Sequence, residues 1–179
     1  YFSTNGMSSL IQAFNSSYHI RESESILKHQ LLSIILTIIL SALVFLTIIL
    51  IIFGKATILY LIEYQTISQN QITLLNIAKW VILIFMLFIA ITTIFNLGPS
   101  IKSKTKIFSA GALLATLFII LTSVVFSYYI DNFSQYNKIY GSIGTLIIIL
   151  LWIYFNAIIL LIGFELNASI INAKKNLNK

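Results

Sequence analysis

Four long runs of uncharged, mostly apolar residues dominate this chain. They span residues 31–53, 80–97, 107–130 and 143–164, and none of them contains Asp, Glu, Lys, Arg or His. An apolar helix needs about 20 residues to cross the hydrocarbon core of a bilayer, which is roughly 30 Å thick. The sequence therefore predicts an all-α fold, a polytopic bundle with four transmembrane helices in this chain.

The composition excludes most other classes of protein. The 179 residues are 59% hydrophobic and 9% charged, with one proline and no cysteine. Soluble domains carry about 25% charged residues, and disordered, collagen-like and disulfide-rich proteins need residues that are scarce here. The strands of a membrane β-barrel would alternate polar and apolar residues, whereas these runs are continuously apolar.

The sequence divides into three parts. Residues 1–30 contain a predicted amphipathic helix that lies against the bundle or at the membrane interface, because its apolar residues recur at helical spacing. These residues are Met7, Leu10, Ile11, Phe14 and Tyr18. Residues 31–166 form the transmembrane domain, and residues 167–179 form a basic tail.

The distribution of charge predicts the orientation in the membrane. Of the eleven Lys and Arg residues, eight fall on the side of the N-terminal segment and three, Lys55, Lys79 and Lys138, fall on the other side. Because positive charge is retained in the cytoplasm, both ends of this chain are expected there. The basic residues are spread over three short flanks rather than gathered beside stacking aromatic residues. A lipid bilayer, not nucleic acid, is therefore the expected partner.

Small and hydroxyl-bearing residues form stripes within the runs. Ser33, Thr37 and Ser41 are spaced by four residues, as are Gly111 and Ala115. Because helices in lipid associate through small residues and hydrogen bonds, such stripes predict packing between helices. The predicted packing residues are Ser41, Gly111, Ala115, Gly141, Gly144 and Gly163. Ser33 and Thr37 could instead line a substrate path.

Two polar residues of the last run carry further expectations. Asn156 lies near the middle of this run. An amide without hydrogen-bond partners in the hydrocarbon would cost several kcal/mol of free energy, so Asn156 is expected to bond to another helix or to line a water-filled cavity. In the second case it would share the substrate path with Asn137, which lies in the short segment before the run. Glu165 is expected at the cytoplasmic boundary, paired with a lysine of residues 102–106 or, alternatively, coupling ion movement to transport.

The residue sets of common enzymes are missing from the sequence. It has no glycine-rich phosphate loop, no Gly-x-Ser-x-Gly motif and no pair of carboxylates buried together, so we expect no enzyme, no cofactor and no metal. His19, Glu22, Glu24 and His29 could be drawn as a metal group, but solvated flanking charges explain them better. Asn-x-Ser/Thr matches at Asn15, Asn132 and Asn167 are interpreted as chance.

Several motifs together resemble the YihY/virulence factor BrkB family, once labelled ribonuclease BN. They are Gly98-Pro99, Gly111-Ala112-Leu113-Leu114-Ala115-Thr116, Tyr136-Asn137-Lys138-Ile139-Tyr140-Gly141-Ser142-Ile143-Gly144, Leu151-Trp152-Ile153-Tyr154 and Leu161-Ile162-Gly163-Phe164-Glu165-Leu166-Asn167-Ala168. The resemblance implies a bacterial inner-membrane protein of about six helices, of which these would be the last four, with both termini cytoplasmic. It also implies a transporter or an envelope factor.

Three functions follow as hypotheses. The first is an inner-membrane protein that moves or handles a small or lipid-like substrate. The alternative is a structural or partner-binding membrane subunit, as a homo-oligomer or in a complex, whose polar stripes serve only packing. The third is an RNA-processing nuclease, which is disfavoured because RNA hydrolysis needs a metal cluster or an acid/base pair that the sequence does not supply.

Overall fold

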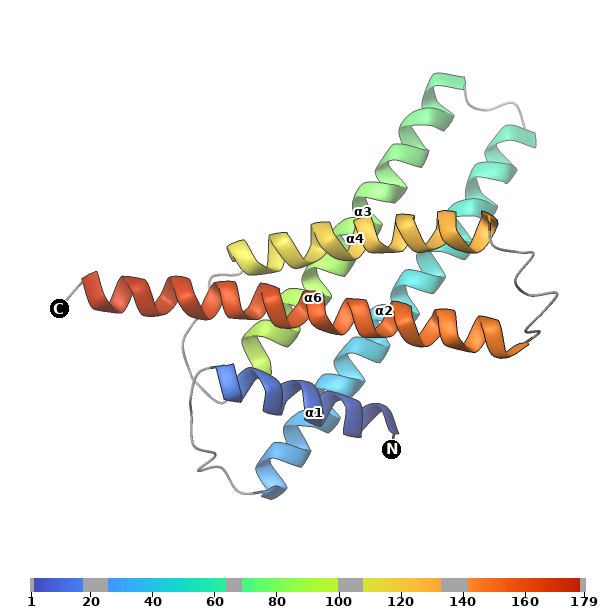
Figure 1. Ribbon diagram of the computed structural model, residues 1–179. Helices are drawn as coiled ribbons and strands as arrows, with labels where there is room; N and C mark the ends of the chain where they lie inside the picture. Colours follow the sequence, from blue (N-terminus) through green and yellow to red (C-terminus); the bar gives the residue numbers. More distant parts are fainter. Residues whose placement is uncertain (1, 18–25, 64–68, 100–107, 133–141, 178–179) are drawn as a thin grey trace.

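The computed structural model describes residues 2–17, 26–63, 69–99, 108–132 and 142–177 (Figure 1). These residues form five helices: α1 (Phe2–Ser17), α2 (Ile26–Glu63), α3 (Gln69–Leu97), α4 (Ala110–Asn132) and α6 (Ser142–Leu177). Within the described ranges there is no strand, and α2, α3, α4 and α6 are long and apolar enough to cross a membrane. The expected all-α fold with four candidate spans is confirmed.

The helices continue beyond the uncharged runs. α2 begins before residue 31 and ends at Glu63, and α3 begins at Gln69 instead of residue 80. α6 runs without a break to Leu177, so most of the expected tail is also helical. The reason is that backbone hydrogen bonding does not stop at the edge of the hydrocarbon, where charged side chains can reach water from a continuing helix.

Two antiparallel helix pairs make up the bundle. α2 lies beside α3, and α4 lies beside α6 (Figure 1). The two pairs cross obliquely, with α3 in contact with α4, and α1 lies against both α2 and α6. The start of α2 lies toward α1, whereas the end of α6 projects beyond α1 (Figure 1).

The buried core lies where α1, α3, α4 and α6 meet. Phe14 of α1 stacks on Phe164 of α6 with 4.1 Å between ring centroids, and Phe95 of α3 meets both rings edge-on at 5.7 Å. Ala112 and Ala115 of α4 complete the cluster and are fully buried. Three aromatic rings from three helices therefore hold the amphipathic α1 against the bundle.

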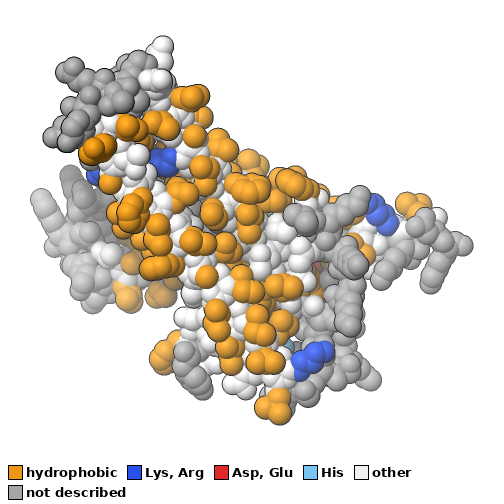
Figure 2. Space-filling model, turned by 180° about the vertical axis from the view of Figure 1, so that it is seen from behind, with side chains coloured by type: hydrophobic (Ala, Val, Ile, Leu, Met, Phe, Trp, Pro, Cys, Tyr) orange, Lys and Arg blue, Asp and Glu red, His pale blue; other side chains and the backbone are white. Residues whose placement is uncertain are grey.

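The outer surface is apolar over most of its area. In the most apolar stretch of α2, only 6% of the residues are buried inside the bundle. In the corresponding stretch of α4 the share is 28%, so α4 is the more central of these two helices. Figure 2 shows hydrophobic side chains spread over much of one face of the molecule. A surface of this kind is stable when acyl chains surround it, as expected for a polytopic membrane protein.

Candidate functional site

The helices α4 and α6 approach each other closely at two glycines. A Cβ atom built on Gly111 would overlap the carbonyl oxygen of Gly163 and lie 2.7 Å from Cγ of Asn167. A Cβ atom built on Gly163 would lie 2.7 Å from the carbonyl oxygen of Gly111 and 2.9 Å from Cβ of Ala115. Neither position has room for a larger residue, so Gly111, Ala115 and Gly163 meet at one crossing of small residues.

Asn167 joins α6 to the start of α4 just beside this crossing. The backbone N–H of Gly111 donates to Asn167 Oδ1 at 2.8 Å, and Asn167 Nδ2 donates to Ser109 Oγ at 2.9 Å. Ser109 Oγ in turn accepts from the N–H of Ala112 at 3.3 Å. The first N–H groups of a helix have no partner within it. Asn167 therefore caps α4 from a neighbouring helix, while Ser109 caps it from within its own chain segment.

The sequence interpretation missed Asn167. We took it for a chance glycosylation match, although it is only 4% exposed and bridges two helices. One signal could have found it, because Asn167 follows Gly163 by four residues and so lies on the same face of the helix. A polar residue on a face of small residues is well placed to bond across the crossing.

The hydroxyls of α2 bond to their own helix. Ser33 Oγ donates to the carbonyl oxygen of His29 at 3.0 Å, and Thr37 Oγ1 donates to that of Ser33 at 2.7 Å. Ser33 is fully buried, whereas Thr37 and the exposed Ser41 line an opening of about 390 Å³ between α1 and α2. Two of the three stripe residues thus border an open volume, and the third is part of the packed interior.

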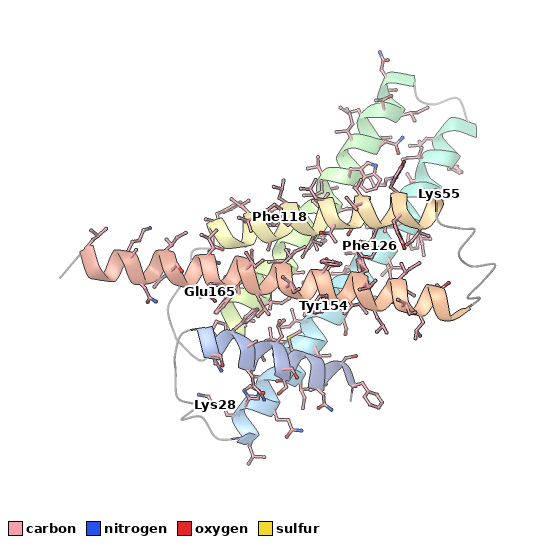
Figure 3. The ribbon with its side chains drawn as sticks, in the orientation of Figure 1. Lys28, Lys55, Phe118, Phe126, Tyr154 and Glu165 are labelled. Atoms are coloured by element: carbon pink, nitrogen blue, oxygen red, sulfur yellow. The ribbon has the colours of Figure 1, made fainter. Side chains whose placement is uncertain are left out.

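Asn156 and Glu165 lie on α6. Asn156 Nδ2 donates to the carbonyl oxygen of Trp152 at 2.6 Å, and no bond from Asn156 to another helix occurs among the described residues. The amide nitrogen therefore bonds locally, one turn back along α6. Glu165 is exposed, and Figure 3 shows it toward the same end of the molecule as Lys28, with Lys55 toward the other end.

Some of the predicted residues cannot be placed. Asn137, Gly141 and the lysines of residues 102–106 lie outside the described residues. Gly144 is half-buried near the start of α6. The pairing of Glu165 with a lysine of residues 102–106 and the path role of Asn137 therefore stay predictions.

A second opening of about 300 Å³ runs along α3 toward the residues that precede α4. Aromatic and aliphatic side chains line most of it, together with two threonines and Asn96. The Oδ1 atom of Asn96 is buried and has no hydrogen-bond partner among the residues that the structure describes. The wall of this opening is therefore mostly apolar.

The described part of the chain offers no metal centre. Within it, no three His, Cys, Asp or Glu side chains are grouped so that they could hold a metal ion. His29 Nε2 forms a hydrogen bond with Ser8 Oγ at 2.9 Å, which ties α2 to α1. His19, Glu22 and Glu24 lie outside the described residues.

Comparisons with known proteins point to one family. The family model described as "Virulence factor BrkB" matches residues 1–179. The chain is 28% identical to YfkH of Bacillus subtilis, whose name calls it ribonuclease-like, over 96% of this chain and 62% of that protein. It is 30% identical to the UPF0761 membrane protein IL2447 of Idiomarina loihiensis, over 65% of this chain and 42% of that protein.

A UPF0761 membrane protein of Haemophilus influenzae is 36% identical over 54% of this chain and 35% of its own length. The chain thus spans about three fifths of the length of YfkH and less than half of the other two relatives. No solved structure matches it.

Proposed function

The chain belongs to the virulence factor BrkB family, and from this premise we propose that it is a multi-pass protein of the bacterial inner membrane that binds and moves a lipid-like substrate. Relatives named as membrane proteins and four helices of spanning length support the membrane part of this proposal. We also propose that it is not an enzyme.

The observation that carries the lipid-like substrate is the position and lining of the openings. Both lie on the outside of the bundle, and apolar side chains form most of their walls, with a few hydroxyls and one amide. A hydrophilic solute would need a continuous polar path. The hydroxyls of Ser33 and Thr37 and the amide of Asn156 instead bond to their own helices. A molecule that enters sideways from the bilayer fits such openings better.

Filling the opening between α1 and α2 is expected to slow lipid movement. Ser41→Phe places a ring in that opening and takes up room that a lipid chain would need, which we expect to raise the barrier to lipid movement by about 1.4 kcal/mol. Movement of a fluorescent phospholipid between the leaflets of liposomes that contain the protein should therefore fall by roughly tenfold. The rate can be measured by quenching the outer-leaflet fluorophore.

The matched control is Ala42→Phe. Ala42 is also exposed on α2 but is not part of the wall of the opening, so this variant should keep the unmodified rate. Equal rates for both variants and the unmodified protein would contradict the role of the opening. Lipid movement no faster than in empty liposomes would contradict the proposed function itself.

The orientation with both ends in the cytoplasm is supported by the excess of basic residues on that side. Because these 179 residues contain no cysteine, each single-cysteine variant carries one thiol within them, and its labelling is measured on the purified protein. In spheroplasts, a membrane-impermeant maleimide should label Lys55→Cys, and it should label Lys174→Cys only after permeabilisation. The reverse labelling pattern would contradict the orientation.

A structural or partner-binding subunit is the second candidate. It is favoured by the tight crossing at Gly111 and Gly163, and by the polar groups that bond within the bundle. A protein that moves no lipid but copurifies with a defined membrane partner would support this candidate. The name of YfkH raises a nuclease as the third. Metal-dependent RNA cleavage by the pure protein that is lost in His19→Ala or Glu22→Ala would support it.

A further inference from the structure

Two lysines lie side by side where the paired helices α2 and α3 leave the hydrocarbon. Lys55 comes two residues after the uncharged run 31–53. Lys79 comes directly before the run 80–97. A Cβ atom built on Gly54 would lie 3.9 Å from Cδ of Lys79, so the stem of Lys79 passes over α2 next to Lys55. Because long basic side chains reach the headgroup layer from a helix, both ammonium groups are expected at the same boundary of the membrane.

No carboxylate pairs with either lysine among the side chains that the structure describes. Lys79 Nζ donates a long hydrogen bond of 3.5 Å to Oδ1 of Asn76 and lies 5.9 Å from the centre of the Trp80 ring, and both partners are neutral. Lys55 is exposed. The segment that connects α2 to α3 contains no acidic residue, and Glu63 lies eight residues beyond Lys55, about 12 Å further along the helix.

An anion at this place would neutralise both lysines. Two neighbouring ammonium groups repel each other, whereas a phosphate between them accepts a charge-assisted hydrogen bond from each. The Trp80 ring, which is 62% exposed, adds a second sign of the headgroup layer, because tryptophan is enriched at that depth of a membrane. The ligand that such a place favours is therefore a phosphate at the membrane surface.

The face of α2 that carries Lys55 leads to the opening between α1 and α2. Ile48 and Val44 line this opening, and they precede Lys55 by seven and eleven residues. Because a helix turns once in 3.6 residues, the three side chains lie on nearly the same face. Eleven residues span about 16 Å, which is roughly half of the 30 Å hydrocarbon core. A phospholipid whose headgroup lies at Lys55 can therefore extend an acyl chain along this face as far as the opening.

We propose that Lys55 and Lys79 together bind the phosphate of an anionic phospholipid, of which phosphatidylglycerol is an example, and that its acyl chain lies along Ile48 and Val44. A phosphatidylcholine carries the same phosphate, but its own ammonium group cancels the charge, so it is held less tightly. A free phosphate has the charge but no chain to bury. The inference rests on the proposed lipid-like substrate and names the charge of its headgroup.

Competition between lipids with matched acyl chains tests the proposal. The purified protein in detergent is mixed with equal amounts of dioleoyl phosphatidylglycerol and dioleoyl phosphatidylcholine, and the bound lipid is counted by native mass spectrometry. We expect one phosphatidylglycerol to be retained with a preference of roughly 25-fold, since each lysine beside an anionic lipid contributes about fivefold, or about 1 kcal/mol. Inorganic phosphate at the concentration of the lipids should leave this ratio unchanged. This measurement uses the unmodified protein and does not depend on the folding of a variant.

Variants that remove one charge locate the site. Lys55→Gln and Lys79→Gln should each lower the preference about fivefold, and the double variant should abolish it. Lys55→Arg keeps the charge and should keep the preference. Lys28→Gln is the matched control, because it removes the same charge from the other end of α2, and its preference should be unchanged (Figure 3).

Equal retention of the two lipids by the unmodified protein would overturn the proposal. An equal loss in Lys28→Gln would also overturn it, because the preference would then follow the net charge of the protein. Displacement of phosphatidylglycerol by inorganic phosphate would show that a soluble anion, and not a lipid, is the ligand. Lipid movement in liposomes is a separate readout. Movement without a headgroup preference overturns this site alone, and a headgroup preference without movement overturns the proposed function alone.

Discussion

Replacing Gly111 with alanine is expected to lower the free energy of unfolding by about 3 kcal/mol, the upper end of the usual cost of overpacking. The added methyl group would overlap the carbonyl oxygen of Gly163 and crowd Cγ of Asn167. A backbone carbonyl in a helix cannot turn aside as the end of a flexible side chain can. The two helices must therefore move apart, and the hydrogen bond from Gly111 to Asn167 lengthens. The measurement is unfolding in mixed detergent micelles as the mole fraction of a denaturing detergent rises.

Gly54→Ala is the matched control for this prediction. A Cβ atom on Gly54 would meet only Cδ of Lys79, at 3.9 Å, an ordinary contact. Alanine also favours the helix over glycine by about 1 kcal/mol, so this variant should be as stable as the unmodified protein or more stable. If Gly111→Ala unfolds at the same point as Gly54→Ala, the close crossing of α4 and α6 is not as the structure has it.

The bilayer made the fold predictable from the sequence. A run such as residues 31–53, apolar and without charge, has few stable states other than a helix in lipid, so the four spans follow from length and composition. The positions at which the helices begin and end could not be predicted from the uncharged runs. Lys55 lies inside α2 and Lys79 lies inside α3, because long basic side chains reach the interface while the backbone stays helical.

The close packing of α4 was partly visible in the sequence. The spacing of Gly111 and Ala115 indicates a face for packing, but one helix alone does not say which helix it meets. The choice of α6 as partner depends on three-dimensional fit, in which the carbonyl of Gly163 occupies the space that Gly111 leaves open. No period in the sequence encodes such a pairing.

Two amides of α6, those of Asn156 and Asn167, differ in the groups to which they bond. Asn156 is near the middle of its span, so we expected it to bond across helices or to line a cavity, yet its amide bonds to Trp152 on α6. Asn167 is near the end of the span and makes the bonds to α4. The unsatisfied N–H groups at the start of α4 determine where an amide is needed, and these groups lie near the membrane boundary.

Asn167→Leu should destabilise the protein by about 3 kcal/mol, because it removes both hydrogen bonds and leaves a buried backbone N–H of Gly111 without a partner. Leucine is of similar size, so the loss measures hydrogen bonding more than packing. Unfolding in mixed detergent micelles measures it. Asn172→Leu serves as the control, since Asn172 is exposed on the same helix and its replacement should change the stability by less than about 0.5 kcal/mol.

Asn167→Asp tests whether Asn167 stabilises the protein by capping α4 or only by the shape of its side chain. A carboxylate can still accept from the N–H of Gly111, and negative charge is favourable at the start of a helix. The hydroxyl of Ser109 can rotate to donate to it, replacing the bond that the amide gives to Ser109 Oγ. Asn167→Asp should therefore retain most of the stability that Asn167→Leu loses. If both variants unfold at the same point, Asn167 holds the two helices by its shape and not by capping α4.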